Sequence, residues 1–289
     1  MIYVVGSINV DLVMKTSRMP SQGETLSGET FFINQGGKGA NQAVAVAKSG
    51  SKVAMIGAVG EDDFGREAIR SLIDFGVDTT HVCKVSGNTG IASIWLTDQD
   101  NRILLNGGAN QKVNETMIQK GLELARPNDM VLLQLEIPLS MVSYTLKLAK
   151  EKQMMTCLNP APMIDLSQDI LNLTDILCVN ETEYESLVHQ KLDIHVPIFI
   201  QTMGSQGVTV SHQKHQFHID AHPVTVIDTT AAGDTFIGAF IAMYEQSKDI
   251  HASAAYANAA AALCVTKYGA QQSIPTKQDV VTFMEVNHD

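Results

Sequence analysis

Cysteine and basic residues are both scarce in this chain of 289 residues. Lysine and arginine number 20 against 31 aspartates and glutamates, which gives a formal net charge of -11. Because proteins bind phosphate backbones mainly through lysine and arginine, this balance argues against a nucleic-acid partner. The cysteines form no Cys-x-x-Cys pair and lie in apolar runs, so we expect reduced thiols inside the core. They are Cys83, Cys157, Cys178 and Cys264.

Long apolar runs are missing as well. No segment approaches the roughly 18 uninterrupted apolar residues of a membrane-spanning helix. The sequence opens directly on MIYVVGSINVD, without a basic stretch followed by a long apolar region. We therefore expect a cytoplasmic protein with no membrane partner. Hydrophobic residues still make up 45% of the composition, which is enough for one large core, with or without a small accessory unit.

Short β-branched apolar runs alternate with longer amphipathic stretches along most of the chain. Near-continuous apolar strands of this kind are covered by helices on both faces, which predicts a three-layer α/β/α core around a mainly parallel sheet. We expect strands at 2–6, 52–57, 130–135, 155–159, 175–180 and 197–202. Helices are expected at 39–49, 62–75, 114–125, 139–152, 233–246 and 251–267.

Two stretches, 12–35 and 90–107, break this alternation. The second contains IASIWLTDQDNRILLN, the pattern of two antiparallel strands joined by a polar turn. Such strands do not fit a parallel core, so we expect a small sheet that projects from it, as a lid over a site or as a dimerisation surface. No linker or repeat marks a second domain, and we predict one folding unit over 1–289.

The segment IDTTAAGDTFIGAF, at 227–240, carries the strongest chemical signal. Small residues end a strand-like lead, and a helix then opens where main-chain N–H groups carry partial positive charge. This place suits a transferring phosphoryl group, and Asp234 would accept the proton of the attacking hydroxyl as general base. The alternative is that Asp234 only caps the helix. The candidate anion hole comprises the N–H groups of Ala231, Ala232 and Gly233.

Two further segments would lie near this one. The turn TMGSQG at 202–207 follows a predicted core strand; alone it indicates a hairpin, but beside a phosphoryl-transfer site it would border the nucleotide phosphates. Asn180 and Glu183 lie one helical turn apart after another core strand, which would aim both side chains at one place above the carboxyl edge of the sheet. A capping interaction at the start of a helix over 181–189 is the alternative.

Two common nucleotide-binding patterns are absent. Gly-Gly-Lys-Gly at 36–39 is not followed by the residues of a Walker A loop. GSINVD at 6–11, after the first strand, lacks Gly-x-Gly-x-x-Gly, which disfavours a hydride-transferring Rossmann enzyme. Phosphoryl transfer fits better.

Together these motifs resemble the ribokinase-like family of sugar and nucleoside kinases. The resemblance runs from about residue 2 to residue 285, and its most specific element is Asp-Thr-Thr-Ala-Ala-Gly-Asp-Thr-Phe at 228–236. It implies a three-layer core with a β-sheet lid, and ATP-dependent phosphorylation of D-ribose at the 5-hydroxyl. Phosphorylation of another small sugar or a nucleoside is one alternative, and a noncatalytic sugar-binding regulatory protein is a second. The other matching motifs are Gly-Ser-Ile-Asn-Val-Asp at 6–11, Gly-Gly-Lys-Gly-Ala-Asn-Gln-Ala at 36–43, Gln-Leu-Glu at 134–136, Asn-Pro-Ala-Pro at 159–162, Asn-Glu-Thr-Glu at 180–183 and Thr-x-Gly-x-x-Gly at 202–207.

The same resemblance implies which residues hold the two substrates. Carboxylates and amides support the sugar set, because a polyol needs many directional hydrogen bonds. The sugar would contact Asn9, Val10, Asp11, Gly37, Lys38, Gly39, Ala40, Asn41, Glu136 and Asp234. ATP would contact Asn180, Thr202, Met203, Gly204, Ser205, Gln206, Gly207, Gly233, Asp234 and Asn258.

The resemblance also implies two cations and a dimer. Magnesium would arrive with ATP near Glu183, partly through water, because this ion gives up its hydration shell reluctantly. Potassium would act as an activator in the loop at 268–273, held mostly by backbone oxygens, although a simple loop is the alternative. A homodimer would form through the lid. The potassium candidates are Asp228, Thr230, Cys264, Lys267, Gly269 and Ser273.

The resemblance weakens in two places. Between Asn180 and Thr202 the chain is shorter than the family usually is, so we expect a missing helix and a sheet face that is partly uncovered, with an exposed apolar patch as one outcome. LLNGGAN at 104–110 would approach the sugar, and its variation leaves the choice of pentose or hexose open.

Overall fold

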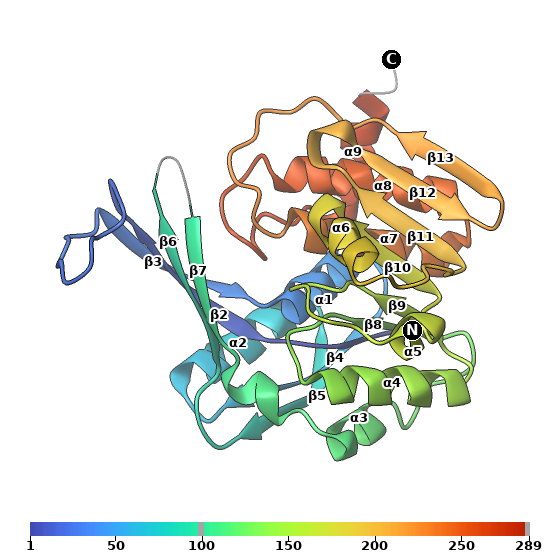
Figure 1. Ribbon diagram of the computed structural model, residues 1–289, viewed down its shortest axis with the longest axis horizontal. Coiled ribbons are helices and arrows are strands. Elements are labelled where there is room, and N and C mark those ends of the chain that lie inside the picture. The colour runs from blue at the N-terminus through green and yellow to red at the C-terminus, as the bar shows by residue number, and fades with distance from the viewer. Residues whose placement is uncertain (98–100, 287–289) are drawn as a thin grey trace.

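The computed structural model describes residues 1–97 and 101–286. Within them, a large sheet lies between two layers of helices, and a second, small sheet stands away from it (Figure 1). The predicted fold class is therefore confirmed. The polar turn predicted between the second pair of lid strands falls on 98–100, which lie outside the described residues, as do 287–289.

The large sheet has nine strands among the described residues, in the order β13-β12-β11-β10-β9-β8-β1-β4-β5. The strands from β11 to β5 run parallel, and β12 and β13 extend the β11 edge antiparallel. All six predicted core strands are present. The edge strand β5 was not predicted, because its sequence DTTHVCKV is largely polar and only half-buried. The bounds are β1 (Ile2–Val5), β4 (Val53–Gly60), β5 (Asp78–Val85), β8 (Met130–Leu133), β9 (Met155–Leu158), β10 (Ile176–Asn180), β11 (Ile198–Thr202), β12 (Val208–His212) and β13 (His215–Ile219).

Helices bury apolar side chains against both faces of this sheet. Because side chains alternate along a strand, Val4 of β1 joins one core and Val5 joins the other. The first core packs under α1 (Lys38–Lys48), α2 (Asp63–Asp74), α7 (Ala232–Ser247), α8 (Ile250–Cys264) and α9 (Lys277–Val286). The second packs under α3 (Glu115–Gly121), α4 (Leu139–Glu151), α5 (Gln168–Asn172) and α6 (Glu181–His189).

Two helices end earlier than predicted. Helix α3 stops at Gly121 rather than near 125. Pro127 lies shortly after it, and a proline disfavours helical backbone at the residue that precedes it. Helix α8 stops at Cys264 rather than near 267. There the Thr266 hydroxyl donates to the Leu263 carbonyl at 2.7 Å, which competes with continued helical bonding.

The small sheet is the one that the sequence predicted as a lid or dimerisation surface, and we call it the lid sheet. Its order is β3-β2-β6-β7, with β2 and β6 parallel and the outer pairs antiparallel. The strands are β2 (Asn9–Lys15), β3 (Thr30–Gly36), β6 (Gly90–Leu96) and β7 (Asn101–Asn106), and a short 3-10 helix, η1 (Gly108–Lys112), follows β7. Strand β2 begins at Asn9, so the residues of the first sugar motif lie at the base of the lid.

The connection between α6 and β11 is short and contains no helix over 190–197, all of which is described. Its apolar side chains nevertheless pack against the second core, and Tyr184 of α6 lies on Phe199 of β11 with ring centroids 5.7 Å apart. No second helix therefore lies between α6 and β11, and apolar side chains of the connection partly cover the sheet face there. The side chains that fill the place are Leu192, Ile194 and Val196.

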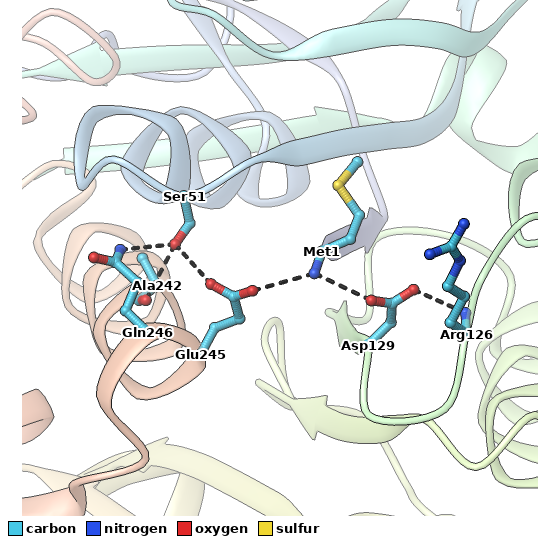
Figure 2. Close-up of polar contacts among 7 residues, drawn as sticks. All are labelled: Met1, Ser51, Arg126, Asp129, Ala242, Glu245 and Gln246. Atoms are coloured by element: carbon cyan, nitrogen blue, oxygen red, sulfur yellow. Dashed lines mark hydrogen bonds and ion pairs between the residues drawn. The ribbon is translucent and has the colours of Figure 1, made fainter.

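Polar contacts consolidate the edge of the sheet opposite the carboxyl ends of the strands (Figure 2). The amino group of Met1 forms ion pairs with Asp129 at 3.1 Å and with Glu245 of α7 at 3.2 Å. Ser51 donates to the other oxygen of Glu245 at 3.2 Å. These contacts join the start of β1 to the loop before β8 and to the end of α7. Across the described ranges, no helix combines the length and the apolar character needed to span a bilayer.

Candidate active site

A cavity of about 220 Å³ lies at the carboxyl edge of the large sheet, where β10 and β11 end and α7 begins. Ligands of parallel α/β sheets bind at this edge, because strand ends and helix starts meet there. The cavity brings together side chains that are far apart in the sequence. It is lined by Lys38, Asn159, Cys178, Val179, Asn180, Glu183, Thr202, Thr229, Ala231, Ala232, Gly233, Asp234 and Ile237.

Asp234 lies in the first turn of α7 and is only 8% exposed. Its Oδ2 accepts a hydrogen bond from Asn41 Nδ2 at 3.0 Å, and its Oδ1 accepts one from Gln42 Nε2 at 2.8 Å. The N-cap of α7 is Ala231, with no side-chain cap. The capping alternative for Asp234 is therefore wrong: its carboxylate faces the amides of α1 at the cavity.

The main chain before Asp234 borders open space. Ala231 adopts a left-handed conformation with φ of 60°, which turns the backbone into the helix. A Cβ placed on Gly233 would meet no atom within 4 Å, so a ligand can approach the main chain there. The N–H of Ala232 donates to the Thr229 carbonyl at 3.2 Å, and it would have to leave this bond to join an anion hole.

The sugar motifs converge on Glu136. Its Oε2 accepts from Ser7 Oγ at 2.5 Å, from the Lys38 N–H at 3.1 Å and from Asn9 Nδ2 at 3.4 Å. Gly37 has a φ of 90°, and a Cβ there would lie 2.6 Å from the Asn9 nitrogen, so only glycine fits this close approach. The predicted residues Asn9 and Lys38 thus both contact Glu136.

Buried charges of both signs surround the cavity. Burial, followed by the charges of Glu136 and Asp234, raises the pKa of Asp11 to about 7. The pKa of Lys38 is raised above its usual value, mainly by the charge of Asp234 and against the effect of burial. Burial also raises the pKa of Glu183. The half-buried Lys38 cation therefore lies among several carboxyl groups, which can accept from sugar hydroxyls or face a bound cation.

Three residues of the predicted sugar set belong to the scaffold of the motifs. Val10 is fully buried. The Gly39 N–H donates to Ser7 Oγ at 3.2 Å, and the Ala40 N–H donates to the Ser7 carbonyl at 2.9 Å. These contacts hold the first turn of α1 against the end of β1.

The predicted nucleotide residues lie in three groups. Asn180 and Glu183 form a capping box at the start of α6, with the Glu183 N–H donating to Asn180 Oδ1 at 2.8 Å, so the capping alternative is confirmed while both side chains also line the cavity. Asn258 of α8 donates to the Asp220 carbonyl at 2.8 Å. Thr202 lines the cavity. The residues after it form a turn with a short 3-10 helix, η2 (Gly204–Gln206), and are not among the lining residues of this cavity in the described chain; they are Met203, Gly204, Ser205, Gln206 and Gly207.

The predicted potassium residues connect two loops. Asp228 accepts from the Thr230 N–H at 2.9 Å through Oδ1 and from the Gly269 N–H at 3.0 Å through Oδ2. Cys264 Sγ lies 3.1 Å from Ser273 Oγ, whereas Lys267 is exposed. Over residues 1–97 and 101–286, no three or more histidine, cysteine or acidic side chains form a group that could hold a metal. A cation here would therefore take most of its ligands from carbonyl and hydroxyl oxygens, with Asp228 the one carboxylate among the predicted residues.

Several buried polar residues of the site were not predicted, although each lies inside a quoted motif. Asn110 donates to Asn9 Oδ1 at 2.7 Å, and Ser7 donates to Glu136. Gln42 contacts Asp234 and also Asn159. Their only sequence signal was a polar side chain within a quoted motif.

Three comparisons relate the chain to known proteins. A model of the pfkB family carbohydrate kinases matches residues 1–277. The ribokinase of Haemophilus influenzae is 39% identical, with 98% of this chain and 97% of the relative covered. A deoxyribokinase of Salmonella typhi is 36% identical, with 99% of each covered. The structure of Arabidopsis thaliana ribokinase complexed with ribose and ATP matches with a TM-score of 0.89, at 31% identity and with 98% of each chain covered.

Proposed function

This chain belongs to the pfkB family of carbohydrate kinases, and we propose that it is a ribokinase that transfers the terminal phosphoryl group of ATP to the 5-hydroxyl of D-ribose. One observation of the site carries this proposal. Asp234 lies between the sugar motifs, which it contacts through Asn41, and the open main chain at Gly233. A base in that position lies between an acceptor hydroxyl and a phosphoryl group.

Each part of the site has a role in the proposed reaction. The carboxylates of Asp11 and Glu136 accept hydrogen bonds from the sugar hydroxyls, and the Asn9 amide can donate or accept. Together they hold the 5-hydroxyl toward Asp234. Asp234 accepts the hydroxyl proton as the oxygen attacks phosphorus and the bond to ADP breaks. The N–H groups at Ala231 and Gly233, and that of Ala232 once it leaves the Thr229 carbonyl, stabilise the charge on the transferring group.

Magnesium would enter with ATP near Glu183. Both oxygens of this carboxylate accept from Asn180, at 2.9 Å from its N–H and 3.1 Å from Nδ2. A carboxylate held this way still has lone pairs for the water shell of a cation, which fits an indirect role. The ion supplies charge neutralisation to the phosphates when bound. Asn180 and Glu183 keep that shell oriented at the cavity.

A monovalent cation is proposed next to Asp228, which joins its own loop to Gly269. The candidate ligands of this place are carboxylate, hydroxyl and carbonyl oxygens, a set that suits a hard ion such as potassium. Its role would be to order the 228–231 segment before the anion hole. We therefore expect potassium to raise activity without contacting either substrate.

A homodimer through the lid is supported by the outer face of the small sheet. Strand pairing places Leu12 beside Ile33 and Met14 beside Phe31, on the face opposite Asp11. Phe31 is 55% exposed and Ile33 is 48% exposed. An apolar face of this kind indicates an interaction surface, and a second lid is the partner we propose.

The cytoplasm is the proposed compartment. All four cysteines are unpaired, which suits a reducing environment. The reaction also needs ATP, which the cytoplasm supplies.

Release of ADP tests the proposed function directly. The protein is assayed with magnesium-ATP and a panel of D-ribose, 2-deoxyribose, fructose, tagatose and nucleosides, each with potassium or sodium. We expect the highest kcat/KM with ribose, a 5-phosphate product by phosphorus NMR, and activation by potassium. A preference for 2-deoxyribose would instead assign the activity named for the Salmonella relative, and ribose binding without ADP release would favour a regulatory protein.

A further inference from the structure

Buried amide side chains form a connected chain behind Asp234. Gln134, directly after β8, donates from Nε2 to Gln42 Oε1 at 2.6 Å. Gln42 of α1 donates from Nε2 to Asp234 Oδ1 at 2.8 Å and to Asn159 Oδ1 at 3.2 Å. Gln42 and Gln134 are both 0% exposed, so bulk water does not compete for these bonds.

The orientation of the Gln42 amide follows from its partners. A carboxylate only accepts, so the NH2 group must face Asp234 and the carbonyl oxygen must face Gln134. Both N–H bonds of Gln42 are then used, one by Asp234 and one by Asn159. The Asp234 carboxylate consequently has a fixed donor on Oδ1, as it has on Oδ2 from Asn41.

Gln134 supports this arrangement at a cost. Its Oε1 is buried and has no hydrogen-bond partner among the described residues. It lies where a Cβ on Gly6 would approach to 2.0 Å, so the main chain closes around it. A buried polar atom without a partner costs stability. Folding alone would be served better by an apolar side chain, which indicates that the amide chain is kept for the site.

The other end of the chain reaches the magnesium side of the cavity. Asn159, directly after β9, donates from Nδ2 to Glu183 Oε2 at 3.5 Å and to the Cys178 carbonyl at 3.2 Å. Gln42 therefore contacts the proposed base and, through one further amide, the carboxylate proposed to face magnesium.

We propose that Gln42 is a positioning residue that holds Asp234 ionised and aimed at the sugar hydroxyl, and that fixes the base relative to Asn159 and Glu183. The inference rests on the proposed kinase function and deepens it. A donor to the ionised form of a carboxylate favours that form. The other charged or titratable groups that face Asp234 are Lys38 of α1, Asp11 of β2, Glu183 of α6 and the Cys264 thiol of α8.

Gln42→Met tests this role, because methionine keeps the length of the side chain and removes the amide. The readout is kcat against pH at saturating ribose and magnesium-ATP, since titration of Asp11 would also enter kcat/KM. Loss of one charge-assisted bond should raise the apparent pKa on the acidic limb by about one unit and lower kcat about 10- to 100-fold at pH 7. KM for both substrates should change less than about threefold, because Gln42 touches neither.

Two other variants keep the test decisive if Gln42→Met folds poorly. Gln134→Met leaves Gln42 in place without its partner and should shift the acidic limb in the same direction by a smaller amount. Thr174→Val removes another buried hydrogen bond, from Thr174 Oγ1 to the Ile170 carbonyl at 2.8 Å, at the edge of the sheet away from the cavity. It should lower the melting temperature and leave the pH profile unchanged.

If the wild-type enzyme is active and the acidic limb is unshifted in both glutamine variants, the inference is overturned but the proposed function stands. A purely structural role would lower kcat without moving the limb. Wild-type protein that phosphorylates no sugar would overturn the proposed function, and the inference with it.

Discussion

Sugar binding should depend on pH through Asp11. In the sugar-free protein, burial and then the charges of Glu136 and Asp234 raise the pKa of Asp11 from 3.8 to about 7. A sugar hydroxyl donates to the ionised carboxylate, so binding favours that form and lowers the pKa. Below pH 7 the carboxyl group must release a proton before it can accept a hydrogen bond. The Kd for ribose should therefore rise about tenfold for each unit by which the pH falls below 7.

The raised pKa of Asp11 makes ribose binding stronger as pH rises, but it makes the sugar-free protein less stable. Between pH 3.8 and about 7 the folded protein holds a proton on Asp11 that the unfolded chain has lost. The contribution of Asp11 to the free energy of unfolding therefore falls as pH rises through this window. A rise in pKa from 3.8 to about 7 corresponds to about 4 kcal/mol. Saturating ribose should remove much of this penalty.

Isothermal titration calorimetry measures the Kd for ribose and the number of protons released on binding. Ribose is titrated from pH 5.5 to 8.5 in buffers with different ionisation heats, and at pH 6 we expect about one proton released per ribose bound. Asp11→Asn should bind more weakly and lose the pH dependence, whereas Asp169→Asn, an exposed change in α5, should keep it. A wild-type Kd that stays constant over this range would refute the reasoning.

Three further predictions concern other parts of the site. Ser7→Ala removes the 2.5 Å hydrogen bond to Glu136 and should raise KM for ribose about tenfold with KM for ATP nearly unchanged. Equal changes in the KM of ribose and of ATP would contradict this prediction. Ser51→Ala, far from the cavity, is the control. Asp228→Asn weakens the contact with Gly269, so activation by potassium over sodium should shrink, and full retention of this activation would count against the cation site. Leu104 of β7 lies in register with Leu12 through Ser93, on the same face as Phe31, and is 69% exposed. Phe31→Asp with Leu104→Asp places charge on this face and should give a monomer in equilibrium sedimentation; a wild-type protein that is already a monomer would contradict the lid dimer.

The elements of the core were predictable because burial leaves a strong pattern. An apolar run such as that of β4, in which every residue is buried, is typical of a central strand that is covered on both faces. The polar edge strand β5 has no such pattern and was missed. The covered face at 190–197 was also missed, because packing of three spaced apolar side chains on the core has no local signature.

The candidate site was predictable as a set of motifs, but its contacts were not. Gln42 and Asp234 are 192 positions apart, so only the fold could show that an amide of α1 and not the helix start holds the carboxylate. Asn180 shows the converse, because its capping box is local and could be read from spacing alone. Where a motif places a polar side chain in a buried position, the sequence indicates that it has a partner without naming it.

The claim that Asp234 is the base of a ribose kinase is tested most directly by Asp234→Asn. The measurement is the rate of ADP release with magnesium-ATP and saturating ribose, made beside calorimetric ribose binding for the same two proteins. We predict that the variant binds ribose, keeps its fold and loses about three orders of magnitude or more in kcat. Turnover within about tenfold of wild type in a variant that binds ribose normally would contradict the account.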